Sequence, residues 1–153
     1  MAGEAILLDT NILIAYVREG RLAVAIESHI RLQSGSTEGL VSVVSIGEAL
    51  AFARKNQWSA ERQEKLRTMM RTRLAPIDIS RAEVLDAYAE IYDFLHRVRK
   101  PAHPIGENDM WIAATARATG ATLVTMDKHF DHLHPDYIKR LWIDPKEGAP
   151  DAN

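Results

Sequence analysis

Short apolar runs alternate with segments of helical periodicity along this chain. Residues 5–8 are continuously apolar, and far along the sequence residues 122–125, Thr-Leu-Val-Thr, have an apolar pair at their centre. Between them, Leu22, Ile26 and Ile30 recur at the spacing of one helix face. Over the whole chain, the pattern predicts strands at about residues 5–8, 40–44, 76–79, 122–125 and 141–143.

The segments between these strands carry helix signals. Helices are predicted at about residues 12–18, 22–32, 45–56, 59–72, 80–99 and 109–119. Ser45 with Glu48, and Ser80 with Glu83, have the spacing of capping boxes at two helix starts. Gly120 is placed to end the last helix. Strands alternating with helices predict an α/β fold with a central, mainly parallel sheet of four to five strands and helices on both faces.

Size and composition favour one ordinary packed domain. The chain has 153 residues, 46% of them hydrophobic. We assign residues 1–145 to this domain and expect residues 146–153 to be a frayed tail. No apolar run approaches the roughly 20 residues that span a bilayer, and the start lacks the basic segment of a signal peptide. The chain has no cysteine, which excludes disulfides and thiolate metal sites, and a cytoplasmic location is expected.

The net charge is close to neutral. The 19 basic and 21 acidic residues give −2, so attraction to a nucleic acid needs a local patch. One basic cluster consists of Arg54, Lys55, Arg62, Lys65, Arg67, Arg71 and Arg73, and a smaller one of Arg97, Arg99 and Lys100. The first cluster fits two interpretations equally well. It is either a surface that follows phosphates or a solvated helix face with internal pairs such as Glu61 with Lys65.

Four acidic residues occupy equivalent places, at the ends of strands or the starts of helices. They are Asp9, Glu48, Asp109 and Asp127. In an open α/β sheet, ligands bind beyond the carboxyl ends of the strands, so these side chains are predicted to meet in one cleft. Crowded carboxylates repel each other unless they are protonated or neutralised. A hard divalent cation removes the repulsion, and a cation held by acids points to phosphate chemistry.

Each of these acids, taken alone, also has a structural explanation. Asp9 fits the N-cap of a helix, and Glu48 fits the last position of its capping box. Asp109 would complement the helix dipole from the first turn, and Asp127 would cap a turn. Only the set of four is therefore informative.

The same residues carry a resemblance to a known family. Residues 9–11, Asp-Thr-Asn after an apolar strand, resemble the opening motif of PIN-domain ribonucleases. Glu48 resembles the second acid of that family, residues 108–116 its third motif and residues 123–130 its fourth. Order and spacing agree over essentially the whole chain. The resemblance implies a PIN-like three-layer α/β/α domain.

The implied activity is that of a Mg²⁺- or Mn²⁺-dependent endoribonuclease. By this resemblance, the catalytic acids are Asp9, Glu48, Asp109 and Asp127. Asp9 and Asp109 would bind the metal directly, whereas the other two would act through water or hold a second ion. Asn11 and Thr125 would orient carboxylates or a water on the metal. One departure is Met126, which stands where the fourth motif often has a polar or basic residue.

The resemblance also implies partners. Small single-domain members of this kind are mostly VapC-like toxins of prokaryotic toxin–antitoxin pairs. The substrate would be single-stranded or loop RNA, and the C-terminal segment of a VapB-like antitoxin would cover the acidic cleft. A homodimer is expected, with the apolar faces of the helices at 22–32 and 59–72 as candidate surfaces.

Other functions remain open at this point. One is a PIN nuclease of RNA processing that is not a toxin. Another is a Mg²⁺-dependent phosphohydrolase, but that class wants a second Asp two residues after the first, where this chain has Asn11. A third is an inactive interaction module, which has no need of all four acids.

The histidines and aromatic residues are given structural roles. The three histidines within residues 129–134 lack zinc-site spacing and are expected in a surface turn. Trp111 and Phe130 have apolar neighbours and are expected in the core. For Trp58, base contact and packing are both open.

Overall fold

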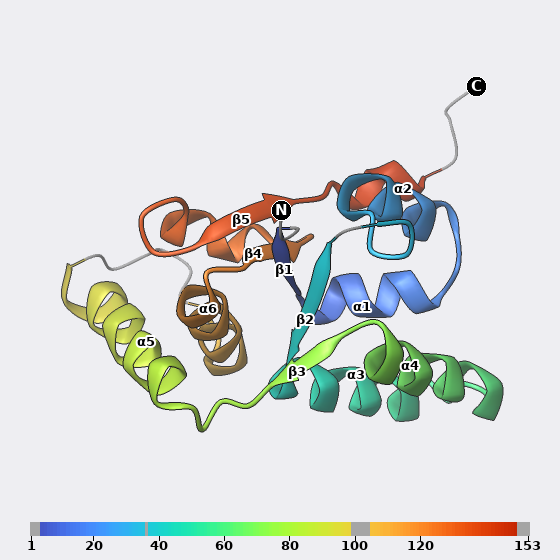
Figure 1. Ribbon diagram of the computed structural model, residues 1–153, viewed down its shortest axis with the longest axis horizontal. Helices are drawn as coiled ribbons and strands as arrows, with labels where there is room; N and C mark the ends of the chain where they lie inside the picture. Colours follow the sequence, from blue (N-terminus) through green and yellow to red (C-terminus); the bar gives the residue numbers. More distant parts are fainter. Residues whose placement is uncertain (1–3, 36, 99–104, 150–153) are drawn as a thin grey trace.

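A five-stranded parallel sheet forms the centre of the computed structural model, which describes residues 4–35, 37–98 and 105–149. Every neighbouring pair of strands is parallel, in the order β3-β2-β1-β4-β5 (Figure 1). The strands are β1 (Ala5–Leu8), β2 (Glu38–Ser42), β3 (Ala75–Ile77), β4 (Thr122–Thr125) and β5 (Lys139–Trp142). This sheet, with helices on both faces, confirms the predicted three-layer α/β/α fold class.

Helices connect the strands. They are α1 (Thr10–Val17), α2 (Arg21–Ile30), α3 (Val43–Lys55), α4 (Ala60–Thr72), α5 (Ala82–Asp93) and α6 (Glu107–Thr119). A π-helical turn, Phe94–Val98, extends α5, and 3-10 helices occupy Lys128–Leu133 and Pro145–Gly148. Within the described residues, no helix is long and apolar enough to cross a membrane.

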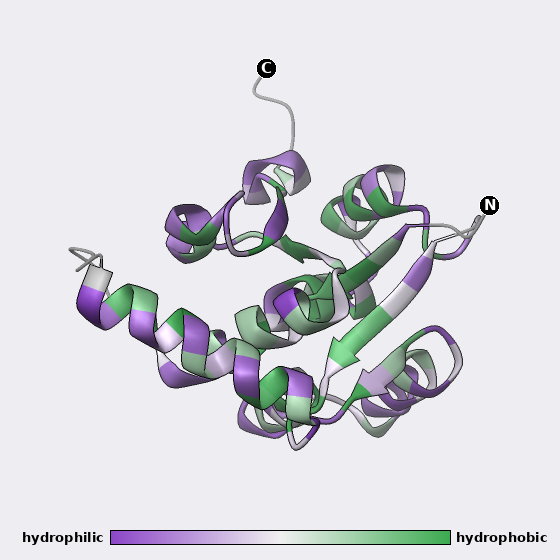
Figure 2. Ribbon diagram, turned by 60° about the vertical axis from the view of Figure 1, so that its left-hand side comes forward, coloured by the Kyte–Doolittle hydropathy of each residue, from purple (hydrophilic) through white to green (hydrophobic). Residues whose placement is uncertain are grey.

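The sheet has an apolar core on each face, because successive strand residues point to opposite sides. Ile6 and Leu8 of β1 pack with α1, α2, α3 and α4, whereas Leu7 packs with α5 and α6. Figure 1 shows α5 and α6 on one side of the sheet and α1, α3 and α4 on the other. In Figure 2 the hydrophobic colour is strong on the strands at the centre, and the hydrophilic colour recurs along the helices around them. Both faces of β1 are thereby buried, which fits its uninterrupted apolar sequence.

Several helix starts differ from the prediction. α1 begins at Thr10, two residues earlier than expected, because Asp9 is its N-cap. The predicted capping box of Ser45 and Glu48 is wrong: Ser42 caps α3 by accepting a hydrogen bond from the Val44 amide, so the helix begins at Val43. The apolar pair after Ser42 extended the strand prediction to residue 44, but these residues form the first turn of α3.

The second predicted capping box, Ser80 with Glu83, is also wrong. α5 begins after Arg81, which makes no side-chain cap, and the Ser80 amide donates instead to Asp78. The strands β1 and β4 have the predicted bounds, and Gly120 ends α6 with a φ of 69°, as predicted. β3 and β5 start one and two residues earlier than predicted. Arg99 and Lys100 lie outside the described residues.

The predicted frayed tail is partly ordered. Pro145–Gly148 form a 3-10 helix beside α2, where Glu147 pairs with His29 at 3.0 Å. A Cβ on Gly148 would lie 2.7 Å from the Leu22 Cβ, so the two segments are in close contact. Residues 150–153 lie outside the description.

The helices proposed as dimer surfaces use their apolar faces inside the domain. In α2, Ile26 and Ile30 are buried, and in α4, Leu66 and Met70 are buried. Only Val24 of α2 remains as a well exposed large apolar residue on either helix. Because these apolar faces are buried inside the domain, they do not support the prediction that they bind a second copy of the chain.

Candidate active site

Asp9 stands at the carboxyl end of β1 and is held from two sides. Its Oδ1 accepts a hydrogen bond of 2.7 Å from the Thr10 amide, and its Oδ2 accepts one of 2.7 Å from the Thr125 hydroxyl. The residue is only 4% exposed. Asp9 is thus a helix N-cap, as the structural explanation required, and it is also a buried acid fixed by a second strand.

Thr125 links two of the acids at the end of β4. Its hydroxyl donates to Asp9 and accepts a hydrogen bond of 2.9 Å from the Asp127 amide. Asn11 contributes from α1, where its Oδ1 accepts from the Met126 amide at 3.3 Å. Residues 125–127 are therefore tied to the start of α1 by side-chain contacts.

Replacing Thr125 by Val should lower metal affinity or cleavage by about 10- to 100-fold, the usual cost of losing a group that orients a metal ligand. The methyl group that replaces the hydroxyl neither donates to Asp9 nor accepts from the Asp127 amide. Thr125→Ser, which keeps the hydroxyl, is the control. Activity of Thr125→Val within a fewfold of the wild type would contradict this role of the hydroxyl.

Glu48 reaches the same place from α3, although it does not start that helix as predicted. It lies in the second turn, where its Oε1 accepts a hydrogen bond of 2.7 Å from the Thr10 hydroxyl. Its Oε2 accepts one of 3.4 Å from the Asn108 side chain. Glu48 therefore joins the starts of α1 and α6. The carboxylate is positioned by these contacts and not by a capping box.

Asp109, in the first turn of α6, lies close to the end of β4. One ligand atom each from Asp109, Asp127 and His129 lie within 4.8 Å of one another. His129 Nδ1 is 3.1 Å from Asp127 Oδ2, and the His129 amide donates to the other Asp127 oxygen at 2.9 Å. Asp9 lies outside this group of three but interacts electrostatically with Asp109.

His129 is the residue that the sequence analysis missed. It was assigned to a surface turn because the three histidines lack zinc-site spacing. The turn is indeed a 3-10 helix at the surface, with Asp127 as its N-cap. The cap at Asp127 was expected, and its consequence, which is that the His129 ring lies beside the acid, was the available signal.

Burial and crowding raise the pKa of two acids. Desolvation raises the pKa of Asp9 to about 6, and the charges of Asp109 and Glu48 add to the effect against the hydrogen bonds of Thr125 and Thr10. Desolvation likewise raises the pKa of Asp109 to about 6, with the charges of Asp127 and Glu48 adding and His129 opposing. Both acids are ionised at neutral pH, so the fold holds several negative charges together.

This donor set fits a divalent cation. Carboxylate oxygens are the preferred protein ligands of Mg²⁺, which needs few of them because it keeps several waters. Carboxylate oxygens also suit Mn²⁺. The raised pKa values of Asp9 and Asp109 reflect burial and repulsion between carboxylates, and a bound cation would offset both.

Asp109→Asn should stabilise the metal-free protein at neutral pH. A carboxyl whose pKa rises from 3.8 to about 6 on folding stabilises the fold below pH 3.8 and loses this contribution as the pH rises through 6. Since Asp109 is partly exposed, we expect a gain of about 1 kcal/mol and about 3 °C in Tm at pH 7.5. Thermal unfolding in EDTA at pH 7.5 and pH 4 tests this. A lower Tm for the variant at pH 7.5, or an equal gain at pH 4, would contradict it.

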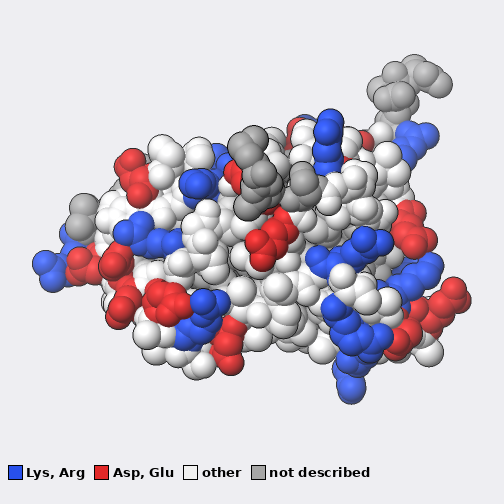
Figure 3. Space-filling view, in the orientation of Figure 1, with Lys and Arg blue, Asp and Glu red and all other residues white. Residues whose placement is uncertain are grey.

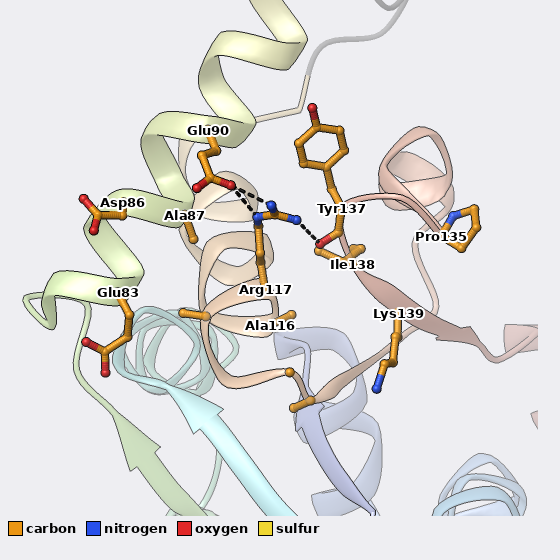
Figure 4. A pocket seen from close by; sticks show the side chains of 13 residues that line it. Glu83, Asp86, Ala87, Glu90, Ala116, Arg117, Pro135, Tyr137, Ile138 and Lys139 are labelled. Atoms are coloured by element: carbon orange, nitrogen blue, oxygen red, sulfur yellow. Dashed lines mark hydrogen bonds and ion pairs between the residues drawn. The ribbon is translucent and has the colours of Figure 1, made fainter.

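A cavity of about 500 Å³ lies at the opposite edge of the sheet, by the amino ends of β4 and β5 (Figure 4). Glu83, Asp86 and Glu90 line it from α5. Arg117 pairs there with Glu90 at 2.6 Å and donates to the Tyr137 carbonyl at 3.1 Å. These contacts join α5 and α6 to the segment before β5. The cavity contains none of the predicted site residues.

The basic cluster lies on α3 and α4, where Figure 3 shows lysine and arginine side chains gathered at the lower right. Part of its charge is neutralised: Lys65 pairs with Glu19, and Arg71 with Glu64. The expected pair of Glu61 with Lys65 is replaced by the first of these. Trp58 is only 7% exposed, which decides for packing over base contact. Phe130 is fully buried and Trp111 partly buried, as predicted for core residues.

Comparison with known proteins places the chain in a family. The family model described as PIN domain matches residues 6–134, a stretch that contains all four acids. The chain belongs to the PIN domain family. This confirms the family resemblance found in the sequence. None of the curated proteins matches this PIN domain protein.

Solved structures share its fold. VapBC2 from Rickettsia felis, bound to a DNA fragment from the promoter, matches with a TM-score of 0.73 and 24% identity over 92% of this chain and 99% of that chain. VapBC-1 from nontypeable Haemophilus influenzae matches with a TM-score of 0.71 and 22% identity over 90% and 97%. VapC20 of Mycobacterium tuberculosis, described as a toxin that cleaves the sarcin–ricin loop, matches with 0.61 and 16% over 84% and 95%. At these identities the matches establish a common fold.

Proposed function

We propose that this PIN domain protein is a divalent-metal-dependent endoribonuclease. The observation that carries the proposal is the convergence of Asp9, Glu48, Asp109 and Asp127 at the carboxyl edge of the sheet, with the pKa of two of them raised to about 6. A fold has no structural reason to bring four acids together, because their mutual repulsion destabilises it. Such a cluster can hold a divalent cation, and the cation can in turn bind a phosphate group.

The residues divide the work as follows. Asp9 and Asp109 would hold the metal, and Asp127 and His129, whose ligand atoms lie close to that of Asp109, would be available to hold a second ion. Thr125 keeps Asp9 oriented. Glu48, held by Thr10 and Asn108, acts through water.

A bound Mg²⁺ or Mn²⁺ would lower the pKa of a water molecule and offset the charge of the scissile phosphate. Water attacks phosphorus in line with the bond to the 3′ oxygen. That bond breaks, leaving a 3′-hydroxyl and a 5′-phosphate. In this step the attacking water would lose a proton to solvent and the 3′ oxygen would gain one from solvent, so no side-chain proton donor is required.

The test is incubation of single-stranded RNA with the protein and Mg²⁺ or Mn²⁺, followed by analysis of the new ends. We expect 5′-phosphate ends inside the RNA. Products with 2′,3′-cyclic phosphates would contradict the mechanism, because they arise from attack by the RNA's own 2′-hydroxyl.

We further infer that the protein is the toxin of a VapBC-type pair. The fold similarity to VapBC complexes from several bacteria supports this inference. It predicts a cognate VapB-like antitoxin whose C-terminal segment covers the acids, and a homodimer. Induced expression of the wild type should arrest growth, and Asp109→Asn should not. Normal growth with active enzyme present would leave a nuclease outside toxin–antitoxin biology.

A further inference from the structure

Lys128 lies over an indole ring beside the acids. Its Nζ is 4.5 Å from the centre of the Trp142 ring. The indole is itself fixed, because its N–H donates a hydrogen bond of 3.0 Å to the Met126 carbonyl. The lysine is exposed to solvent, and it follows Asp127 directly in the chain. The indole therefore gives the ammonium group a resting position on the surface.

That place is at the same edge of the sheet as the acids. Trp142 at the end of β5 is in register with Thr125 at the end of β4, and Thr125 binds Asp9. The carboxylate of Asp127 pairs with the neighbouring His129 imidazole. Lys128 forms no ion pair with a carboxylate in the described part of the chain, although an acid precedes it. The ring therefore keeps a positive charge beside the acidic cluster without neutralising the cluster.

The charge of the acidic cluster opposes the binding of a polyanion at this site. The four acids repel the phosphates of an approaching RNA strand, and a bound metal offsets this repulsion only at the scissile phosphate. A cation–π contact at an exposed position is weak, so the ammonium group leaves the ring readily for a phosphate. An amine on a flexible stem suits a phosphate as a point charge.

We propose that Lys128 binds the phosphate next to the scissile one in the RNA strand, with Trp142 holding its side chain ready for that contact. The proposal rests on the proposed nuclease function. It assigns the path of the strand across the site, from the acids beyond the end of β4 toward the end of β5. Lys128 is a substrate-binding residue, and Trp142 positions it.

Salt dependence of RNA binding tests this proposal. In an Asp109→Asn background, which is not expected to cleave, the affinity for a labelled single-stranded RNA is measured at increasing salt. Loss of one phosphate contact in Lys128→Gln should reduce the slope of log affinity against log salt by about 0.7. Lys128→Arg should restore the slope, because it keeps the charge. A purely structural role of Lys128 would not change this slope.

The matched control is Lys139→Gln. This variant removes the same positive charge from β5. Lys139 lies at the start of the strand, beside the cavity of Figure 4, whereas Trp142 lies at its end. The Lys139 variant should leave the slope unchanged. In the active enzyme, Lys128→Gln should raise KM by about 3- to 10-fold with little change in kcat. Equal slopes for the Lys128 and Lys139 variants, with the wild type cleaving RNA, would overturn this proposal alone. A wild type that cleaves no RNA would overturn the proposed function and this inference with it.

Discussion

Asp109→Asn and Asp9→Asn should each reduce RNA cleavage by about a thousandfold. A metal that stabilises charge in the transition state contributes several kcal/mol, and each 1.36 kcal/mol is a factor of ten in rate. Asn preserves the size of the side chain but removes a charge that holds the cation. Asp9→Asn also places an amide N–H toward the Thr125 hydroxyl, which donates to the carboxylate in the wild type.

Single-turnover cleavage of RNA at saturating Mg²⁺ measures this loss. Asp86→Asn is the matched control, because it removes an exposed acid of α5 that lines the cavity at the other edge of the sheet. We expect the control to keep wild-type activity and unfolding temperature. Cleavage by the Asp9 or Asp109 variant within a fewfold of wild type would contradict the assignment of these two acids as metal ligands.

Cleavage should also fall steeply as the pH is lowered through 6. Asp9 and Asp109 must both be ionised to bind the cation, and burial raises the pKa of each to about 6. At pH 5 each is about one-tenth ionised, so activity at limiting metal should be about a hundredfold below its value at pH 8. The logarithm of the rate should approach a slope of two against pH below the inflection.

Metal concentration provides the check on this profile. Protons and cations compete for the same oxygens, so raising Mg²⁺ should move the inflection to lower pH. In Asp109→Asn, any residual activity should approach a slope of one, because one titrating ligand remains. A profile that is flat from pH 8 to pH 5, or an inflection that ignores metal concentration, would contradict the role of these two acids.

The fold class was predictable because it depends on patterns that the sequence shows directly. The uninterrupted apolar residues of β1 and the central Leu123 and Val124 of β4 are buried in the sheet, and both strands have the predicted bounds. The starts of helices were less predictable. Ser42 and Ser45 are both good caps, and only Ser42 accepts a hydrogen bond from the helix start, while the Ser45 hydroxyl is buried without a partner among the described residues.

The candidate site was predictable in its acids but not in its contacts. Asp9 follows an obvious strand, so its place at the sheet edge follows from the α/β pattern. The bonds of Glu48 to Thr10 and Asn108 depend on where three helices meet, which no local signal in the sequence specifies. Lys128 was missed for the same reason, since its contact depends on the pairing of β4 with β5, whereas the cap at Asp127 was a local signal for His129.

The most direct test of the central claim is metal removal and restoration in a cleavage assay. Protein stripped with EDTA is incubated with single-stranded RNA, and Mg²⁺ or Mn²⁺ is then added in excess of the chelator. We predict no cleavage in EDTA and full cleavage after either metal is added, with 5′-phosphate products. Cleavage at the same rate in EDTA would contradict the claim that the four acids at the carboxyl edge act through a divalent cation.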